Sequence, residues 1–240
     1  MATKKTKTLA AVTTVSTVTA AQYIPLTDGN GNTTKVSLAN LKSALLAGIN
    51  LNTINDGIFI MFHRSSDNYP LMVKPDKWPG YQNSGEIAEG VVEGGKILVV
   101  APTEITLYWS SAAVSAGGKT TTDRLTALDD WTGKTSTAAQ ITHAECNTAS
   151  YAPGFCTTYS RTNANNKGLT AGRWWLPSLG GLMMIYANMR KINYALSLIE
   201  GATQLAETWY WSSTEYSATS AWYLYLNNGN AGYYTKATAQ

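Results

Sequence analysis

Two stretches of the chain decide its fold: RWWLPSLGGLMMIYANMRKINYALSLI (residues 173–199) and WYWSSTEYSATSAWYLYLNNGNAGYYTKATAQ (residues 209–240). The first predicts a helix over residues 178–199, because Ser178 is a favourable N-cap and Gly201 can end the helix. Apolar residues recur along it at every third or fourth position, so one side of this helix is predicted to be buried. The second stretch predicts strands over residues 209–212, 221–227 and 231–235, with NNGN at residues 227–230 as a hairpin turn.

The closing stretch also has an unusual composition, since Glu215 and Lys236 are its only charged residues. Tyr offers a large contact area at low entropic cost, and Ser, Gly and Asn offer adaptable hydrogen bonds, a mixture typical of antibody-like binding loops. Successive residues of a strand point to opposite faces of a sheet. The predicted inward set, which packs against the helix, is Trp222, Leu224 and Leu226. The predicted outward set is Tyr223, Tyr225 and Asn227, beside Tyr233 and Tyr234, with Tyr210 and Tyr216 approaching from the preceding strand and loop.

Between residue 57 and the first of these stretches the predicted elements are short and mixed. Strands are predicted over residues 58–62, 96–100 and 105–109, and a further helix over residues 136–147, with loops rich in Gly, Pro and Asn between them. Short strands spaced irregularly around an amphipathic helix favour an α+β domain with an antiparallel sheet and two helices, covering residues 57–240.

Two smaller segments precede this domain. Residues 1–22, rich in Thr, Ala, Val and Lys, are predicted to form an extended attachment tail. A cleaved signal peptide is the alternative, although Thr interrupts the apolar segment that such a peptide needs. Residues 23–56 predict a strand–turn–strand–helix module and linker, with DGNG at residues 28–31 in the turn and a helix over residues 38–47. A unit this small buries too little surface to stand alone, so we expect it to form an oligomer.

Composition and charge exclude several classes of function. Charged residues make up 14% of the 240 residues, against roughly 25% in an average globular domain, a surface that suits extracellular or virion proteins. The net charge of +3 comes with no basic stripe, so nucleic-acid binding is not predicted. No apolar run approaches the roughly 20 residues of a membrane helix, so membrane insertion is not predicted either.

Motifs that suggest enzyme chemistry are all incomplete. GGKT and GKT lack the earlier glycine of a phosphate-binding loop. HAEC at residues 143–146 opens like a zinc deaminase motif, which must continue as Pro-Cys-x-x-Cys, but only a single cysteine, Cys156, follows Pro153. Neither His63 nor His143 lies in a nucleophile context. The sequence therefore predicts no enzyme, catalytic residue, metal or cofactor. Cys146 and Cys156 could form a disulfide or remain two thiols.

The quoted stretches carry a resemblance to a known family. RWWLPSLGG and YWSSTEYS, followed by AWY and by an Asn-Gly turn, resemble the major-paralogous-domain family, the C-type-lectin-like domains of bacterial surface and phage proteins. The same ending resembles the variable regions that diversity-generating retroelements mutate in phages of gut bacteria. Separately, IPLTDGNGNTTKVSLANLKSALL is similar to a short module near the N-terminus of phage fibre proteins.

These resemblances imply a function. They imply a C-type-lectin-like domain on a virion appendage protein that binds a host-surface glycan or protein, forms a homotrimer, and attaches to other virion proteins through its tail. The alternative is a secreted or surface-anchored bacterial binding module. Retroelements rewrite adenines, and the candidate ligand-binding residues are of types that an asparagine codon can yield: Tyr210, Tyr216, Ser217, Thr219, Ser220, Tyr223, Tyr225, Asn227, Asn228, Asn230, Tyr233 and Tyr234, together with Gly232. The interleaved residues expected to stay constant are Trp209, Trp211, Trp222, Leu224 and Leu226.

The chain departs from the family in three respects. Gly181 stands where the family has Glu, so the capping box with Ser178 is missing and a looser helix start is expected. The family's final strand with an Arg-Pro pair does not follow, so the sheet could lack a closing strand or borrow one from another chain. The calcium-site motifs of sugar-binding lectins are also missing, so calcium-dependent binding is not implied.

Overall fold

The computed structural model describes residues 23–27, 33–37, 57–93 and 98–237. The chain divides into two compact units, Met1–Ile54 and Asn55–Gln240. In the first unit, β1 (Tyr23–Thr27) and β2 (Thr33–Ser37) pair as an antiparallel hairpin with Tyr23 opposite Ser37. The predicted tail and the predicted helix over residues 38–47 lie outside the described residues, and the trimer stays a prediction.

The second unit begins with a four-stranded antiparallel sheet of order β4-β3-β5-β6. Its strands are β3 (Ile58–His63), β4 (Pro70–Val73), β5 (Gly90–Glu93) and β6 (Leu98–Val100), with the 3-10 helix η2 (Pro75–Lys77) and α2 (Trp78–Asn83) after β4. Ile58, Ile60 and Phe62 are buried while their neighbours are partly exposed, the alternation of a strand with one face on the core. The predicted strand over residues 58–62 is confirmed.

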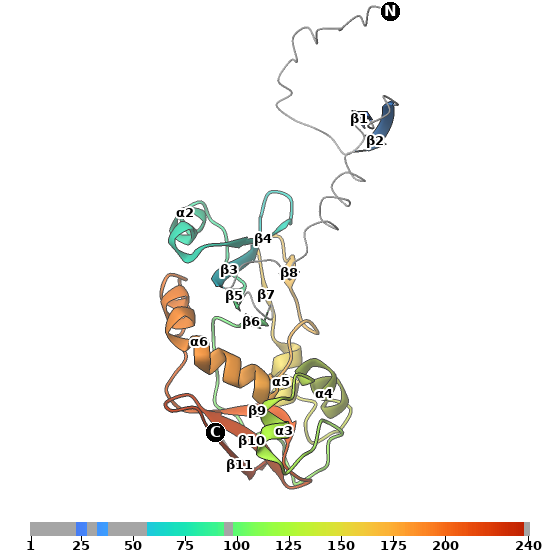
Figure 1. Ribbon diagram of the computed structural model, residues 1–240, viewed down its shortest axis with the longest axis vertical. Coiled ribbons are helices and arrows are strands. Elements are labelled where there is room, and N and C mark those ends of the chain that lie inside the picture. The colour runs from blue at the N-terminus through green and yellow to red at the C-terminus, as the bar shows by residue number, and fades with distance from the viewer. Residues whose placement is uncertain (1–22, 28–32, 38–56, 94–97, 238–240) are drawn as a thin grey trace, which may run out of the picture. The chain divides into compact units, whose positions relative to one another are not determined.

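Helix α6 (Leu179–Ser197) is the centre of this unit. It contacts β3 and β5 on one side and β9 and β10 on the other, so that it lies between two sheets (Figure 1). The predicted helix is confirmed, and its buried residues include Leu182, Ile185, Ile192 and Leu196. Together with β3, β5 and Trp222 they form the larger hydrophobic core. A smaller core contains Trp109, Leu176 and Trp211.

Tertiary contacts hold the start of α6. The Ser178 side chain makes no capping hydrogen bond. The Leu179 N–H instead donates to Thr214 Oγ1 at 2.9 Å, and that hydroxyl donates to Asp130 Oδ2 at 2.7 Å. A Cβ at Gly180 would lie 2.6 Å from the Asp130 carbonyl oxygen, so glycine permits this close approach. A capping box is thus absent, and residues distant in sequence supply the first turn with a partner.

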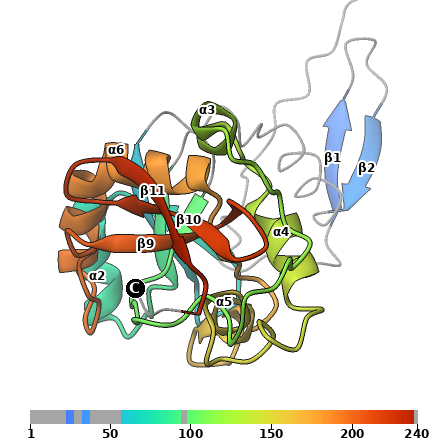
Figure 2. The same cartoon turned by 90° about the horizontal axis from the view of Figure 1, so that it is seen from below.

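The second sheet closes the chain. It has three antiparallel strands in the order β11-β10-β9, namely β9 (Trp209–Glu215), β10 (Ser220–Tyr225) and β11 (Asn230–Thr235). Figure 2 shows it crossing over α6. All three predicted strands are confirmed, although β9 runs three residues beyond its predicted end at Ser212. A register shift lies between Ala221 and Tyr223 where β10 pairs with β9.

Other sequence predictions need correction. Residues 105–109 are not a strand, because their backbone groups do not pair with a neighbouring strand. The Trp109 N–H donates to the Lys236 carbonyl, and the Tyr108 carbonyl accepts from the N–H of Ala152. One isolated bridge, between Tyr108 and Tyr151, is the exception. The helix expected over residues 136–147 is α4 (Gly133–Gln140). It ends early where the Thr142 hydroxyl bonds the Ala139 carbonyl, a local bond that competes with the helix.

The described residues also include elements that the sequence did not reveal. These are β4, η2, α2, β5, α3 (Arg124–Leu128), α5 (Ala152–Thr158) and the short pair β7 (Arg161–Thr162) and β8 (Gly168–Leu169). The expectation of two helices is therefore wrong, while the α+β class with antiparallel sheets is confirmed. No described helix has the length and apolarity of a membrane span.

Candidate ligand-binding face

The two faces of β10 differ in the way that alternation predicts. Trp222 and Leu224 are buried, as is Leu226 just after the strand, and all three belong to the larger core. Tyr223 and Tyr225 are half-buried on the opposite face. The predicted register is confirmed, so a surface rich in tyrosine lies on the side of the sheet away from α6.

Trp209 is the centre of that surface. β9 pairs with β10 so that Trp209 lies opposite Tyr225. The Trp209 ring stacks on Tyr223 with centroids 4.6 Å apart, and meets Tyr225 and Tyr234 edge-on at 6.0 and 6.3 Å. We call Trp209, Tyr223, Tyr225 and Tyr234 the Trp209 cluster. It joins side chains of all three strands, and Tyr234 keeps 43% of its surface exposed.

A second aromatic group lies at the other face of the same sheet. Tyr233 pairs with Trp222 across β10 and β11, whereas Tyr234 pairs with Ala221. The Tyr233 ring stacks on Tyr216 with centroids 3.6 Å apart, and both rings meet Trp222 edge-on. A hydrogen bond with Tyr233 raises the pKa of the Tyr216 hydroxyl. The prediction that Tyr233 and Tyr216 lie beside Tyr223 and Tyr225 is wrong. Consecutive strand residues take opposite faces, so Tyr233 faces the Trp222 side, and Tyr216 stacks on it there.

Tyr210 is an internal contact rather than a member of the outward surface. It lies opposite Leu224 and packs against the larger core. Its hydroxyl donates to the Glu104 carboxylate and accepts the N–H of Ala206 at 2.9 Å. Burial, followed by the contact with Glu104, raises the pKa of Tyr210. The expectation that Tyr210 contributes to the same face as Tyr223 is therefore wrong.

The turn between β9 and β10 presents three of the predicted hydroxyl residues. The Ser220 carbonyl accepts from the N–H groups of Tyr216 and Ser217, closing the turn. The Ser217 and Thr219 hydroxyls lie 3.2 Å apart, and those of Thr219 and Ser220 lie 3.5 Å apart. These hydroxyls are therefore together, next to Tyr216.

The turn between β10 and β11 presents the predicted asparagines. Asn228 Oδ1 accepts the N–H of Asn230 at 3.0 Å, and Gly229 has a φ of 72° that glycine adopts without strain. Asn227 donates to Glu207 Oε2 at 3.2 Å. All three asparagines are exposed, at the end of the sheet that also carries Tyr225.

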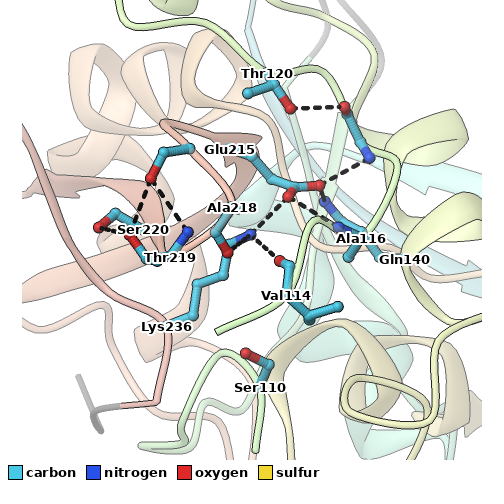
Figure 3. Close-up of polar contacts among 12 residues, drawn as sticks. Ser110, Val114, Ala116, Thr120, Gln140, Glu215, Ala218, Thr219, Ser220 and Lys236 are labelled. Carbon is cyan, nitrogen blue, oxygen red and sulfur yellow. Dashed lines mark hydrogen bonds and ion pairs between the residues drawn. The ribbon is translucent and has the colours of Figure 1, made fainter. Parts of the chain in front are cut away.

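The two charges of the closing stretch form a buried ion pair. Lys236 Nζ lies 2.6 Å from Glu215 Oε2, and both side chains are fully buried (Figure 3). Nζ also donates to the carbonyls of Val114 and Ala218 at 2.6 and 3.2 Å, and lies over the Trp109 ring. Burial lowers the pKa of Lys236, and the contact with Glu215 opposes that effect.

The carboxylate of this pair has further partners. Glu215 Oε1 accepts the N–H of Gly118 at 2.8 Å, and Oε2 accepts the N–H of Ala116 at 3.1 Å. A Cβ at Gly118 would lie 2.9 Å from Glu215 Oε1 and 2.4 Å from Gln140 Nε2, so glycine allows the backbone to reach the carboxylate. The pair thus connects β9 and the residue after β11 to residues 114–118. These bonds stabilise the sheet that carries the Trp209 cluster.

Sequence reasoning missed three residues of this arrangement. Trp209 was expected to be scaffold but is half-buried at the centre of the outward cluster. The pairing of Glu215 and Lys236 could have been predicted from the sequence. They are the two charged residues in a stretch of 32 and have opposite signs, and a buried charge is strongly destabilising without a partner.

The two cysteines are free thiols. Cys146 is buried in the smaller core, and Cys156 packs against the same core. Burial raises the pKa of Cys146 to about 11 and that of Cys156 to about 12. Within the described residues, no group of three or more His, Cys, Asp or Glu side chains could hold a metal ion.

A buried polar cluster lies at the other sheet. His63 Nδ1 lies 2.8 Å from both oxygens of the buried Glu89 carboxylate, which also accepts the N–H groups of His63 and Leu169. Burial raises the pKa of Glu89. Asn163 donates to the His63 carbonyl at 3.1 Å. These bonds connect β3 to the β7–β8 hairpin.

Comparison of the chain with protein-family models, curated proteins and solved structures finds no match.

Proposed function

We propose that this chain is a phage virion appendage protein whose domain at residues 57–240 binds a ligand on the host surface. The observation that carries the proposal is the Trp209 cluster. Aromatic side chains from three strands gather on one face of a sheet, and the stretch that builds this face holds no exposed charge. Clustered Trp and Tyr side chains are the residues that most often dominate binding free energy at protein interfaces.

The chemistry of the face suits a glycan or a protein. Tyrosine rings offer apolar stacking surface together with a hydroxyl. Exposed hydroxyls and amides in the two turns, from Thr219, Asn227, Asn228 and Asn230, add adaptable hydrogen bonds. A ligand on the Trp209 cluster would contact Tyr225 and Tyr234 first, because they are less enclosed than the stacked Tyr223.

A C-type-lectin-like arrangement and diversification of the face by a retroelement are part of this proposal. In support, Trp211, Trp222, Leu224 and Leu226, which the proposal keeps constant, are all buried. Gly232 shows how one varied position would affect another, since a Cβ there would meet the Tyr223 hydroxyl oxygen at 2.4 Å. Replacing Gly232 would therefore move the Tyr223 ring.

Binding of the fluorescently labelled full-length chain to a panel of intact bacteria tests the proposal by flow cytometry. We expect saturable binding to at least one strain, weakened about tenfold or more by Tyr234→Ser, the change in affinity that a central binding residue produces. Tyr194→Ser is the matched control, because Tyr194 lies on α6 and is 57% exposed. Equal binding by the chain and both variants, or binding to no strain, contradicts the proposed face.

A second measurement separates the virion from the secreted alternative. Mass spectrometry of purified phage particles should detect the chain with residues 1–21 retained. Recovery only from the culture medium, cleaved near Ala20 and Ala21, would instead identify a secreted binding module.

A further inference from the structure

Residues of both hydrophobic cores line a cavity of about 590 Å³. Leu182 and Leu226 of the larger core and Leu176 and Trp211 of the smaller core contribute to its wall. The remaining wall comes from residues within 98–107, 152–159, 169–177 and 203–211 and from Ile185. Trp209, Tyr210 and Trp211 all line the cavity, so it lies along β9, the edge strand of its sheet, and it shares Trp209 with the Trp209 cluster.

Aromatic rings make up much of the wall: Phe155, Tyr159, Trp174, Trp175, Trp209 and Trp211. The polar atoms of three of these side chains have partners in the protein. The Tyr159 hydroxyl lies 2.8 Å from Thr103 Oγ1, and the indole N–H groups of Trp174 and Trp211 donate to backbone carbonyls. These three side chains therefore offer a ligand mainly the carbon surface of their rings.

Charge on the wall is confined to exposed positions. Of the lining residues only Glu104 and Arg173 are charged, and both are exposed. Glu104 already accepts the Tyr210 hydroxyl. Because an unpaired charge in an apolar site is strongly unfavourable, a ligand inside this cavity should be uncharged.

The size of the cavity also argues for an occupant. The cavity is open to solvent on one side, where Ile105 and Thr208 are exposed, so a ligand can enter it. Apolar cavities bind water poorly but take up small apolar molecules. Pockets of about 300–1,000 Å³ with aromatic walls and few polar groups are typical small-molecule sites.

We propose that this cavity is a binding site for an uncharged, apolar small molecule that carries one or more aromatic rings. The site borders the outward face at Trp209, but the inference does not depend on the proposed host recognition. A ligand there would contact residues of both cores and pack against β9.

Titration of the full-length chain with N-phenyl-1-naphthylamine tests this inference, because this uncharged two-ring-system probe fluoresces in apolar surroundings. We expect one saturable site per chain. Ala101→Trp, which adds a ring at a lining residue, should weaken binding at least tenfold. Ala138→Trp is the matched control, because Ala138 is exposed on α4 and does not line the cavity. It should bind the probe as the unmodified chain does.

Folding of each variant is checked by circular dichroism. If Ala101→Trp does not fold, Thr208→Trp replaces it, because Thr208 lines the cavity from an exposed position. Absence of saturable binding to the unmodified chain overturns the inference, whether the cavity is closed or filled by other residues of the chain. Equal weakening by the lining and control variants overturns it as well.

Discussion

The closing sheet carries two regions built in opposite ways. Around Trp209 the side chains are aromatic and uncharged, and they contact one another at the surface. Around Glu215 and Lys236 the side chains are charged and fully buried, and directed hydrogen bonds join them to residues far away in sequence. The first region tolerates substitution, because ring contacts are individually weak. The second does not, because each removed partner leaves a buried polar group unpaired.

This difference explains how one short stretch could vary its surface and keep its fold. The residues that fix β9 and β11 are the Glu215–Lys236 pair and buried Trp and Leu side chains. On the outward face, Tyr225 and Tyr234 make only edge-on ring contacts with Trp209, while Tyr223 also packs against the smaller core. Substitutions in both regions, ordered by the expected loss of unfolding free energy, therefore test whether the two regions contribute differently to stability.

The largest effect is expected from Trp222→Ala. The Trp222 side chain is 3% exposed in the larger core, and its Nε1–H donates to the Thr121 carbonyl at 2.8 Å. Removing a buried Trp costs about 3–5 kcal/mol of unfolding free energy. Urea unfolding followed by circular dichroism measures the loss. The control is Trp131→Ala, since Trp131 is 45% exposed, and an equal loss there would refute the inward assignment of Trp222.

A loss of about 3 kcal/mol is expected from Glu215→Gln, because a buried Lys236 charge then lacks its partner. The same urea experiment measures it. Lys236→Met alone should cost a similar amount, since it leaves the Glu215 carboxylate buried without a counter-charge. Neutral residues of similar volume often replace a buried pair without loss. The double variant Glu215→Gln with Lys236→Met should therefore recover most of the stability, and a fully additive double loss would show that the pair is not the cause.

Local pattern was enough to predict part of this molecule. The period of the apolar residues predicts α6, and alternation along β10 assigns Trp222, Leu224, Tyr223 and Tyr225 to their faces. Both inferences use neighbours within one element. They needed no knowledge of what lies across the sheet.

The rest depends on contacts between distant residues. The face of Tyr233 follows from its pairing with Trp222, and Tyr210 is held by Glu104, 106 positions earlier in the chain. The irregular path of residues 109–121 follows hydrogen bonds to Glu215 and Lys236. Alternation alone fixes neither register nor such long-range partners.

The smallest effects are expected on the outward face, where the two tyrosines of β10 should now differ. From the sequence, Tyr223→Ala and Tyr225→Ala are both expected to leave stability nearly unchanged. Tyr223, however, stacks on Trp209 at 4.6 Å and packs against the smaller core. Tyr223→Ala loses a half-buried large side chain and one stacked ring contact. Together these should lower the free energy of unfolding by about 2 kcal/mol. Tyr225→Ala, which loses an edge-on contact at 6.0 Å, should cost less than about 0.5 kcal/mol.

Urea unfolding of both variants beside Tyr223→Phe decides this point. Tyr223→Phe keeps the ring, and within residues 57–93 and 98–237 the Tyr223 hydroxyl makes no hydrogen bond, so its stability should stay within about 0.5 kcal/mol of the unmodified chain. A loss for Tyr223→Phe as large as that for Tyr223→Ala would mean that the hydroxyl, rather than the stack on Trp209, holds the side chain. A loss for Tyr225→Ala equal to that for Tyr223→Ala would mean that the outward cluster is a continuation of the core. Substitutions in the Trp209 cluster would then destabilise the fold, and this cluster would not differ from the Glu215–Lys236 region in its tolerance of substitution.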